Sequence, residues 1–85
     1  MPTISMFYGI LIRMYYDDHN PPHFHAIYNS FSASFTFDGK ILEGNFPKKE
    51  LKLVEAWSII HRKELEANWL LAKNCEKPYD IKPLS

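Results

Sequence analysis

An alternation of apolar and polar residues between positions 31 and 38 constrains the fold of this chain most. Every second position is apolar, namely Phe31, Ala33, Phe35 and Phe37, and the positions between them hold serine, threonine and aspartate. Because successive side chains of a β-strand point to opposite faces, this pattern predicts a strand with one face in the core. A chain of 85 residues has room for one such core, so we expect a single domain over residues 1–85.

Three further segments have the composition of strands. Residues 7–16 and 23–28 are rich in β-branched, aromatic and aliphatic side chains, and residues 41–43 form a shorter run that ends at Gly44-Asn45. Asn29-Ser30 and Asp38-Gly39-Lys40 have turn composition and separate these segments. The order of the runs predicts an antiparallel sheet of three to four strands.

The second half of the chain changes to a helical period. Pro47 suits the first position of a helix, and residues of one buried stripe then recur every three or four positions, as Leu51, Val54, Trp57 and either Ile60 or His61. A second set, Leu65, Trp69 and Ala72, follows the charged residues 62–64. We therefore expect two helices with a break near His61, both tryptophans in the core, and an extended, mobile tail over residues 77–85.

Strands followed by helices, without alternation of the two, are typical of the α+β class. The sequence predicts that two C-terminal helices pack on one face of the antiparallel sheet. The core should then bring together Ile12, Phe24, Phe35, Val54 and Trp57.

Three of the four histidines, His19, His23 and His25, surround the rigid Pro21-Pro22 pair. Imidazole is the side chain whose ordinary pKa lies nearest neutral pH, so the cluster indicates proton transfer, metal ligation or phosphate contact. The alternative is that these rings are structural and bond to the backbone of the turn. A strand that begins at His23 would place His23 and His25 on the solvent face, opposite Phe24, where they would titrate as coupled surface groups. On the same face we expect Arg13, Tyr15, Ser34 and Thr36.

The spacing His-x-x-x-His-x-His, with Asp17 and Asp18 close by, supplies ligands of the kinds that bind a divalent transition metal such as zinc. The candidate metal ligands are His19, His23 and His25. The spacing matches no zinc-finger pattern, so the metal is one alternative for the cluster.

A ribonuclease-like phosphodiesterase is another alternative. His23 and His25 would act as acid and base, with His19 as a second partner, and Arg13 would stabilise the phosphate. Tyr15 and the lysines Lys48, Lys49 and Lys52 are candidate substrate-binding residues, although a solvated helix face explains the lysines as well.

The charge balance and the cysteine count limit the classes of function. Ten lysines and arginines balance ten aspartates and glutamates, so the chain lacks the overall positive charge that drives non-specific binding to nucleic acid. The single cysteine, Cys75, cannot form an internal disulfide, which favours a cytoplasmic location. No segment resembles a signal peptide or a transmembrane helix, so no membrane association is expected.

Distinctive motifs are spread along nearly the whole chain. They are Met1-Pro2-Thr3-Ile4, Phe7-Tyr8-Gly9-Ile10, Ile12-Arg13-Met14, Asp18-His19-Asn20-Pro21-Pro22-His23-Phe24-His25, Leu42-Glu43-Gly44, Pro47-Lys48-Lys49, Trp57, His61-Arg62 and Asn68-Trp69. Together they resemble a small bacterial family, domain of unknown function 4160. The segment Ser30-Phe31-Ser32-Ala33-Ser34 departs from the charged or aliphatic strand that this resemblance leads us to expect.

The resemblance implies a partner rather than a reaction. Such proteins are often encoded beside another small protein in an arrangement similar to a toxin–antitoxin pair, so we expect an interaction component that binds the product of a neighbouring gene. RNA and a second copy of the chain are further candidate partners. The resemblance carries over no catalytic residues.

Overall fold

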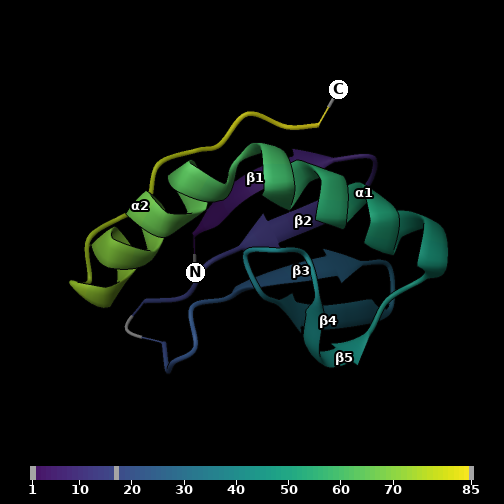
Figure 1. Cartoon of the computed structure of the whole chain (residues 1–85), viewed down its shortest axis with the longest axis horizontal. Coiled ribbons are helices and arrows are strands. Elements are labelled where there is room, and N and C mark those ends of the chain that lie inside the picture. The colour runs from purple at the N-terminus through teal and green to yellow at the C-terminus, as the bar shows by residue number, and fades with distance from the viewer. Residues whose placement is uncertain (1, 17, 85) are drawn as a thin grey trace.

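The computed structural model describes residues 2–16 and 18–84, in which five strands precede two helices (Figure 1). The elements are β1 (Thr3–Phe7), β2 (Ile10–Arg13), β3 (Phe24–Tyr28), β4 (Phe31–Phe35), β5 (Ile41–Asn45), α1 (Lys48–Ile60) and α2 (Arg62–Lys73). All neighbouring strands are antiparallel, and their order in the sheet follows the chain, β1-β2-β3-β4-β5. The α+β class is confirmed, but the sheet has five strands rather than three to four.

The extra strand comes from a hairpin that the sequence prediction missed. The single strand expected over residues 7–16 is wrong, because the chain turns at Tyr8 (φ 50°) and Gly9 (φ 79°) and pairs Phe7 with Ile10. Two consecutive residues with positive φ match the tight hairpin turn that continues the twist of its strands. Tyrosine rarely adopts a positive φ, and the apolar run continues across the turn. Gly9 is therefore the one residue that could have indicated this turn in the sequence.

The other two hairpins lie where the turn composition predicted them. Tyr28 pairs with Phe31 across Asn29-Ser30, and Gly39 adopts φ 81° in the turn before β5. A Cβ atom at Gly39 would lie 2.6 Å from Cα of Glu55, so the turn can pack against α1 only without a side chain. β5 does not end at residue 43 as expected. It passes through Gly44, where a Cβ atom would lie 2.4 Å from the carbonyl oxygen of Ser32.

Both helices cover the same face of the sheet, as predicted (Figure 1). The five core residues named from the sequence, Ile12, Phe24, Phe35, Val54 and Trp57, are all fully buried. The ring of Trp57 lies 5.6 Å from that of Phe24 in an edge-to-face arrangement, and both tryptophans are in the core. Phe31 departs from the predicted alternation, since it starts β4 beside the turn and remains 40% exposed.

The two helices meet at His61, where the sequence predicted a break. His61 has φ −110° and ψ 24°, and it closes α1 through its N–H to the carbonyl oxygen of Trp57. Pro47 precedes α1 as its N-cap, one position earlier than expected. No helix in residues 2–16 and 18–84 is long and apolar enough to cross a membrane.

The tail lacks regular structure, as expected, but it is anchored rather than free. The side chain of Asn68 donates to the carbonyl oxygen of Tyr79 (2.8 Å) and accepts from its N–H (2.9 Å). Trp57 Nε1 donates to the carbonyl oxygen of Lys82, and the N–H of Ile81 donates to the carbonyl oxygen of Ile4 in β1. These bonds and the burial of Ile81 hold the tail against the helices and β1, whereas all five residues of β5, at the other edge of the sheet, are exposed.

Candidate functional site

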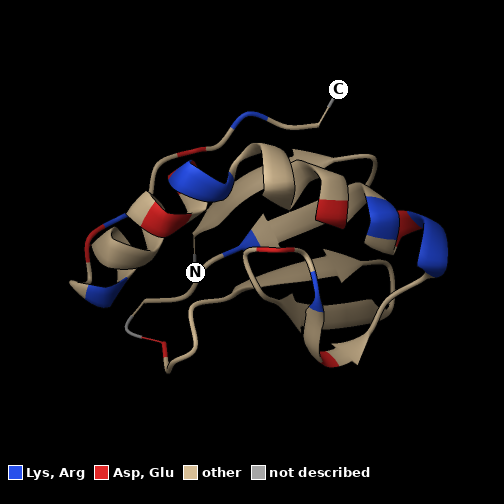
Figure 2. Cartoon of the chain, in the orientation of Figure 1, with Lys and Arg blue, Asp and Glu red and all other residues tan. Residues whose placement is uncertain are grey.

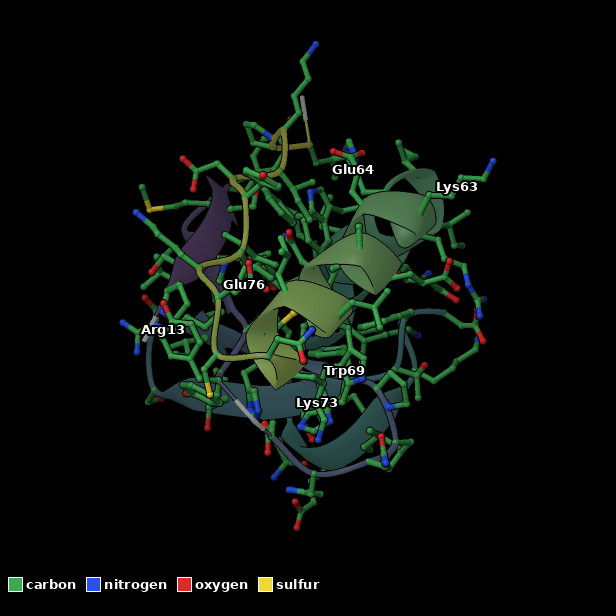
Figure 3. All side chains as sticks on the ribbon, turned by 90° about the vertical axis from the view of Figure 1, so that its left-hand side faces the viewer. Arg13, Lys63, Glu64, Trp69, Lys73 and Glu76 are labelled. Carbon is green, nitrogen blue, oxygen red and sulfur yellow. The ribbon has the colours of Figure 1, made fainter. Side chains whose placement is uncertain are left out.

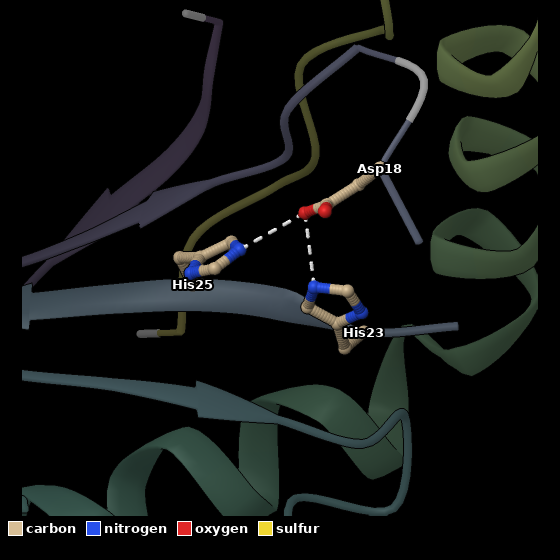
Figure 4. Close-up of side chains that lie close together, drawn as sticks. All are labelled: Asp18, His23 and His25. Atoms are coloured by element: carbon tan, nitrogen blue, oxygen red, sulfur yellow. Dashed lines mark hydrogen bonds and ion pairs between the residues drawn. The ribbon is translucent and has the colours of Figure 1, made fainter. Parts of the chain in front are cut away.

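The histidine cluster lies in the segment that joins β2 to β3. This segment includes a cis peptide bond between Asn20 and Pro21 and directs the carboxylate of Asp18 toward the start of β3 (Figure 4). Oδ2 of Asp18 lies 2.9 Å from Nε2 of His23 and 3.2 Å from Nε2 of His25. Nδ1 of His19 lies 3.0 Å from the other carboxylate oxygen, Oδ1. A single carboxylate therefore contacts all three histidines.

His23 occupies a different environment from the one predicted. Its side chain is 3% exposed, and its ring lies 5.5 Å from that of Trp69 in α2. The prediction of a solvent-facing His23 is wrong because β3 begins at Phe24, so His23 precedes the strand and α2 covers it. His25 does face outward, with 26% of its side chain exposed and its ring centroid 4.3 Å from that of Tyr15.

The two ring nitrogens of His23 both face acceptors. Nδ1 lies 2.6 Å from the carbonyl oxygen of Pro21, which can only accept a hydrogen bond, so Nδ1 carries the ring proton. A neutral ring would then present the lone pair of Nε2 to the carboxylate of Asp18. Either a second proton on the ring or a cation between Nε2 and the carboxylate removes this repulsion.

The electrostatics of the cluster keep Asp18 charged and His25 neutral. Partial burial raises the pKa of Asp18, but hydrogen bonds from the N–H of His19 and from His25, together with the nearby imidazoles of His23 and His19, lower this pKa overall. Burial lowers the pKa of His25, and the opposing hydrogen bond to Asp18 does not restore it. A carboxylate and a neutral imidazole are the forms that bind metals.

The last turn of α2 holds the segment around Asp18 through a hydrogen bond to its main chain. Nζ of Lys73 donates to the main-chain carbonyl oxygen of Asp18 at 2.8 Å and lies 5.8 Å from the ring centre of Trp69. Figure 3 shows Lys73 and Trp69 together at this end of α2, well separated from Arg13. The helix therefore supports both Asp18 and His23.

A row of side chains continues from His25 across the outer face of the sheet. The strand register pairs Arg13 with His25, His25 with Ser34, and Ser34 with Glu43. A cavity of about 160 Å³ opens beside the cluster and is lined by His19, Pro21, His23, His25, Ser34, Leu42 and Glu43. The side chain of Glu43 makes no hydrogen bond or ion pair with any residue in the described ranges.

Several predicted site residues lie elsewhere. Arg13 neighbours His25 in the register but does not line the cavity. The hydroxyl of Thr36 accepts hydrogen bonds from the N–H groups of Asp38 and Lys40 within a turn, so Thr36 does not share the outer face. Ser34 does lie on that face, but it is buried. The lysines Lys48, Lys49 and Lys52 belong to the start of α1, at the opposite end of the molecule from the cluster (Figure 2). Asp17, the other carboxylate considered for the metal, lies outside the described residues.

The sequence prediction missed the part that three residues play in the site. Asp18 was only a nearby carboxylate, yet it is the centre of the cluster. Glu43 enters through the register of β4 and β5, which contains an irregularity between Ser34 and Phe35 that no sequence pattern reveals. Lys73 lies 55 positions from Asp18 and carries no signal of its role.

Fold and site together define a small α+β protein with a histidine–aspartate cluster at one end of its sheet. A family model described as Domain of unknown function (DUF4160) matches residues 9–70, and the chain belongs to this family. The matched region covers β2 through most of α2 and therefore includes the whole cluster. Neither a curated protein nor a solved structure matches the chain.

Proposed function

We propose that this protein binds one divalent transition metal ion, such as zinc, through Asp18, His23 and His25. The observation that carries this proposal is the convergence of three ligand atoms, Oδ2 of Asp18 and Nε2 of both histidines, which all lie within 4.8 Å of one another. The hydrogen bond from Nδ1 of His23 to Pro21 directs the Nε2 lone pair into the cluster. This is the usual support of a metal-bound histidine.

Two of the three ligand separations suit a shared ion. Zinc binds imidazole nitrogen and carboxylate oxygen at about 2.0–2.2 Å, so two such ligands at angles between 90° and 109° lie about 2.8–3.6 Å apart. The separations of Asp18 Oδ2 from the two histidine nitrogens, 2.9 and 3.2 Å, fall in this range. His19, with 81% of its side chain exposed, is within reach as a further ligand. Three protein ligands leave coordination positions open, as in catalytic rather than structural zinc sites.

Isothermal titration of the metal-free, untagged protein with zinc chloride tests the proposal. We expect one ion per chain for the wild type and a loss of affinity of about tenfold or more for Asp18→Asn and for His25→Ala. His61→Ala is the matched control, because His61 bonds to Glu64 outside the cluster. If Asp18→Asn and His25→Ala both bind zinc as the wild type does, the cluster is not a metal site.

Metal binding accounts for the cluster better than metal-free cleavage of RNA does. Such cleavage requires two imidazoles that reach a phosphate, but His23 is buried and both of its nitrogens face protein acceptors. Among the described residues that line the cavity there is no lysine or arginine to bind the phosphate.

We infer a second function, binding of a small partner protein, from the free edge of β5. All five residues of β5 are exposed, and Leu42 leaves 44% of its surface open. An uncovered edge strand offers unpaired N–H and C=O groups to an extended segment of another chain. The occupant we propose is a strand of the protein encoded by a neighbouring gene, as in a toxin–antitoxin-like pair.

Co-expression followed by size-exclusion chromatography with light scattering tests this pairing. We expect a stable complex for the wild type, loss of the complex for Leu42→Pro, which removes an N–H group from β5, and retention for Leu70→Lys on the exposed face of α2. Independent migration of the two wild-type proteins at micromolar concentration would exclude this partner. A dimer of this chain alone would identify a second copy as the occupant instead.

A further inference from the structure

Glu43 is an unused carboxylate beside the proposed metal ion. It projects from the edge strand β5 into the cavity that His23 and His25 also line, and its carboxylate has no hydrogen-bond or ion-pair partner in residues 2–16 and 18–84. Ser34 separates it from His25 by one strand, so Glu43 lies on the far wall of the cavity from His25. A carboxylate held opposite a metal ion with open coordination positions can accept a proton from water bound to the metal.

We propose that the metal-loaded protein hydrolyses uncharged acyl compounds, that is esters or amides, with Glu43 as the general base. This inference rests on the proposed metal binding by Asp18, His23 and His25. It assigns a catalytic role to Glu43, which is neither one of the proposed ligands nor one of the site residues predicted from the sequence.

The proposed reaction is a balanced hydrolysis. Glu43 accepts a proton from the water as its oxygen attacks the acyl carbon, which forms a C–O bond and moves the carbonyl electron pair onto the carbonyl oxygen beside the metal ion. The tetrahedral centre then collapses and breaks the bond to the alcohol or amine. Glu43 returns its proton to this leaving group, and the products are a carboxylic acid and an alcohol or amine.

The charge of the cavity selects the class of substrate. The exposed carboxylate of Glu43 repels a phosphate group, and no lysine or arginine among the described lining residues offsets this repulsion. A wider groove of about 510 Å³ shares His25, Ser34 and Glu43 with the cavity and extends over Tyr15, Ile27 and Ser32. An uncharged compound with an extended side group therefore fits this face better than a phosphodiester.

Hydrolysis of p-nitrophenyl acetate by the zinc-saturated protein tests the inference, with bis(p-nitrophenyl) phosphate as the second substrate. We expect saturable ester hydrolysis that is lost when zinc is removed, a fall in kcat of about 100-fold or more for Glu43→Gln, and no hydrolysis of the phosphodiester. Glu50→Gln on α1 is the matched control and should behave as the wild type. Zinc affinity is measured for each variant by calorimetry and should not change for Glu43→Gln.

The outcomes separate the two proposals. If zinc binds but the ester is not hydrolysed, or if Glu43→Gln is as active as the wild type, the hydrolytic role of Glu43 is wrong and the metal site stands. If the phosphodiester is the better substrate, the assignment of an uncharged acyl substrate is overturned. If zinc does not bind at all, both the metal site and the hydrolysis are wrong.

Discussion

Lys73 and Asp18 are joined by a hydrogen bond of 2.8 Å from the lysine ammonium to the aspartate main-chain carbonyl oxygen. The bond connects the last turn of α2 to the segment that carries the proposed metal ligand, across 55 positions of sequence. It leaves the carboxylate of Asp18 free to face the histidines. The helix layer therefore positions the candidate site without entering it.

Replacing Lys73 with methionine should weaken zinc binding by about tenfold, because the carbonyl of Asp18 loses its donor and the carboxylate is held less firmly. The methionine retains the apolar stem against Trp69. Calorimetric titration with zinc measures the effect, and Lys63→Met, at an exposed position of the same helix, is the control. Equal affinity of both variants and the wild type would show that Lys73 does not support the site.

The metal-free protein should become less stable as the pH falls from 7 to 5. The pKa of His25 is lowered in the folded state, so between its folded and unfolded values the unfolded chain binds more protons, and the free energy of unfolding rises with pH. The contribution is complete above the ordinary histidine pKa of about 6.5 and is lost as the pH falls through the lower folded value. Asp18, whose pKa is also lowered, adds a loss in the same direction at more acidic pH.

Urea denaturation at pH 5, 6 and 7 in the presence of a chelator checks this dependence. His25→Gln should show a shallower dependence on pH over this window than the wild type, since it lacks the group that titrates there. Identical slopes for the two proteins would contradict the lowered pKa of His25.

Trp57→Ala should cost about 3–5 kcal/mol of unfolding free energy, enough to unfold much of so small a domain. Trp57 is fully buried against Phe7 and Phe24, and its Nε1 donates to the carbonyl oxygen of Lys82. Chemical denaturation measures the change. Trp57→Phe retains most of the ring and should cost clearly less, so equal losses for both variants would argue against packing as the cause.

Asn68→Ala should release the tail while the sheet and helices remain folded. The substitution removes both hydrogen bonds to Tyr79 and leaves two main-chain groups without partners, a cost of about 1–3 kcal/mol. Hydrogen exchange should show faster exchange at the N–H groups of Tyr79 and Ile81 and unchanged protection in β3. Asn74→Ala, at the exposed end of α2, is the control, and unchanged exchange in the tail of Asn68→Ala would mean that other contacts anchor it.

The elements that the sequence predicted correctly are those in which the pattern and the burial coincide. Two apolar patterns each produce a buried face: the alternation at Ala33, Phe35 and Phe37, and the helical spacing of Val54 and Trp57. In both cases the spacing of the apolar residues matches the period of the element, so their side chains lie on one side of it. The hairpin at Tyr8-Gly9 was missed because its apolar residues continue through the turn. At this turn the apolar composition is typical of a continuous strand, whereas the backbone reverses direction.

For the candidate site, the sequence by itself determined the local chemistry: three imidazoles and a carboxylate within eight residues, around two prolines. The tertiary structure alone decided how they are used. It buried His23 under Trp69, turned its Nε2 and that of His25 toward Asp18, and brought Glu43 and Lys73 to the same end of the sheet. Such long-range neighbours follow from strand register and helix packing, which depend on the whole core and not on the spacing within any one segment.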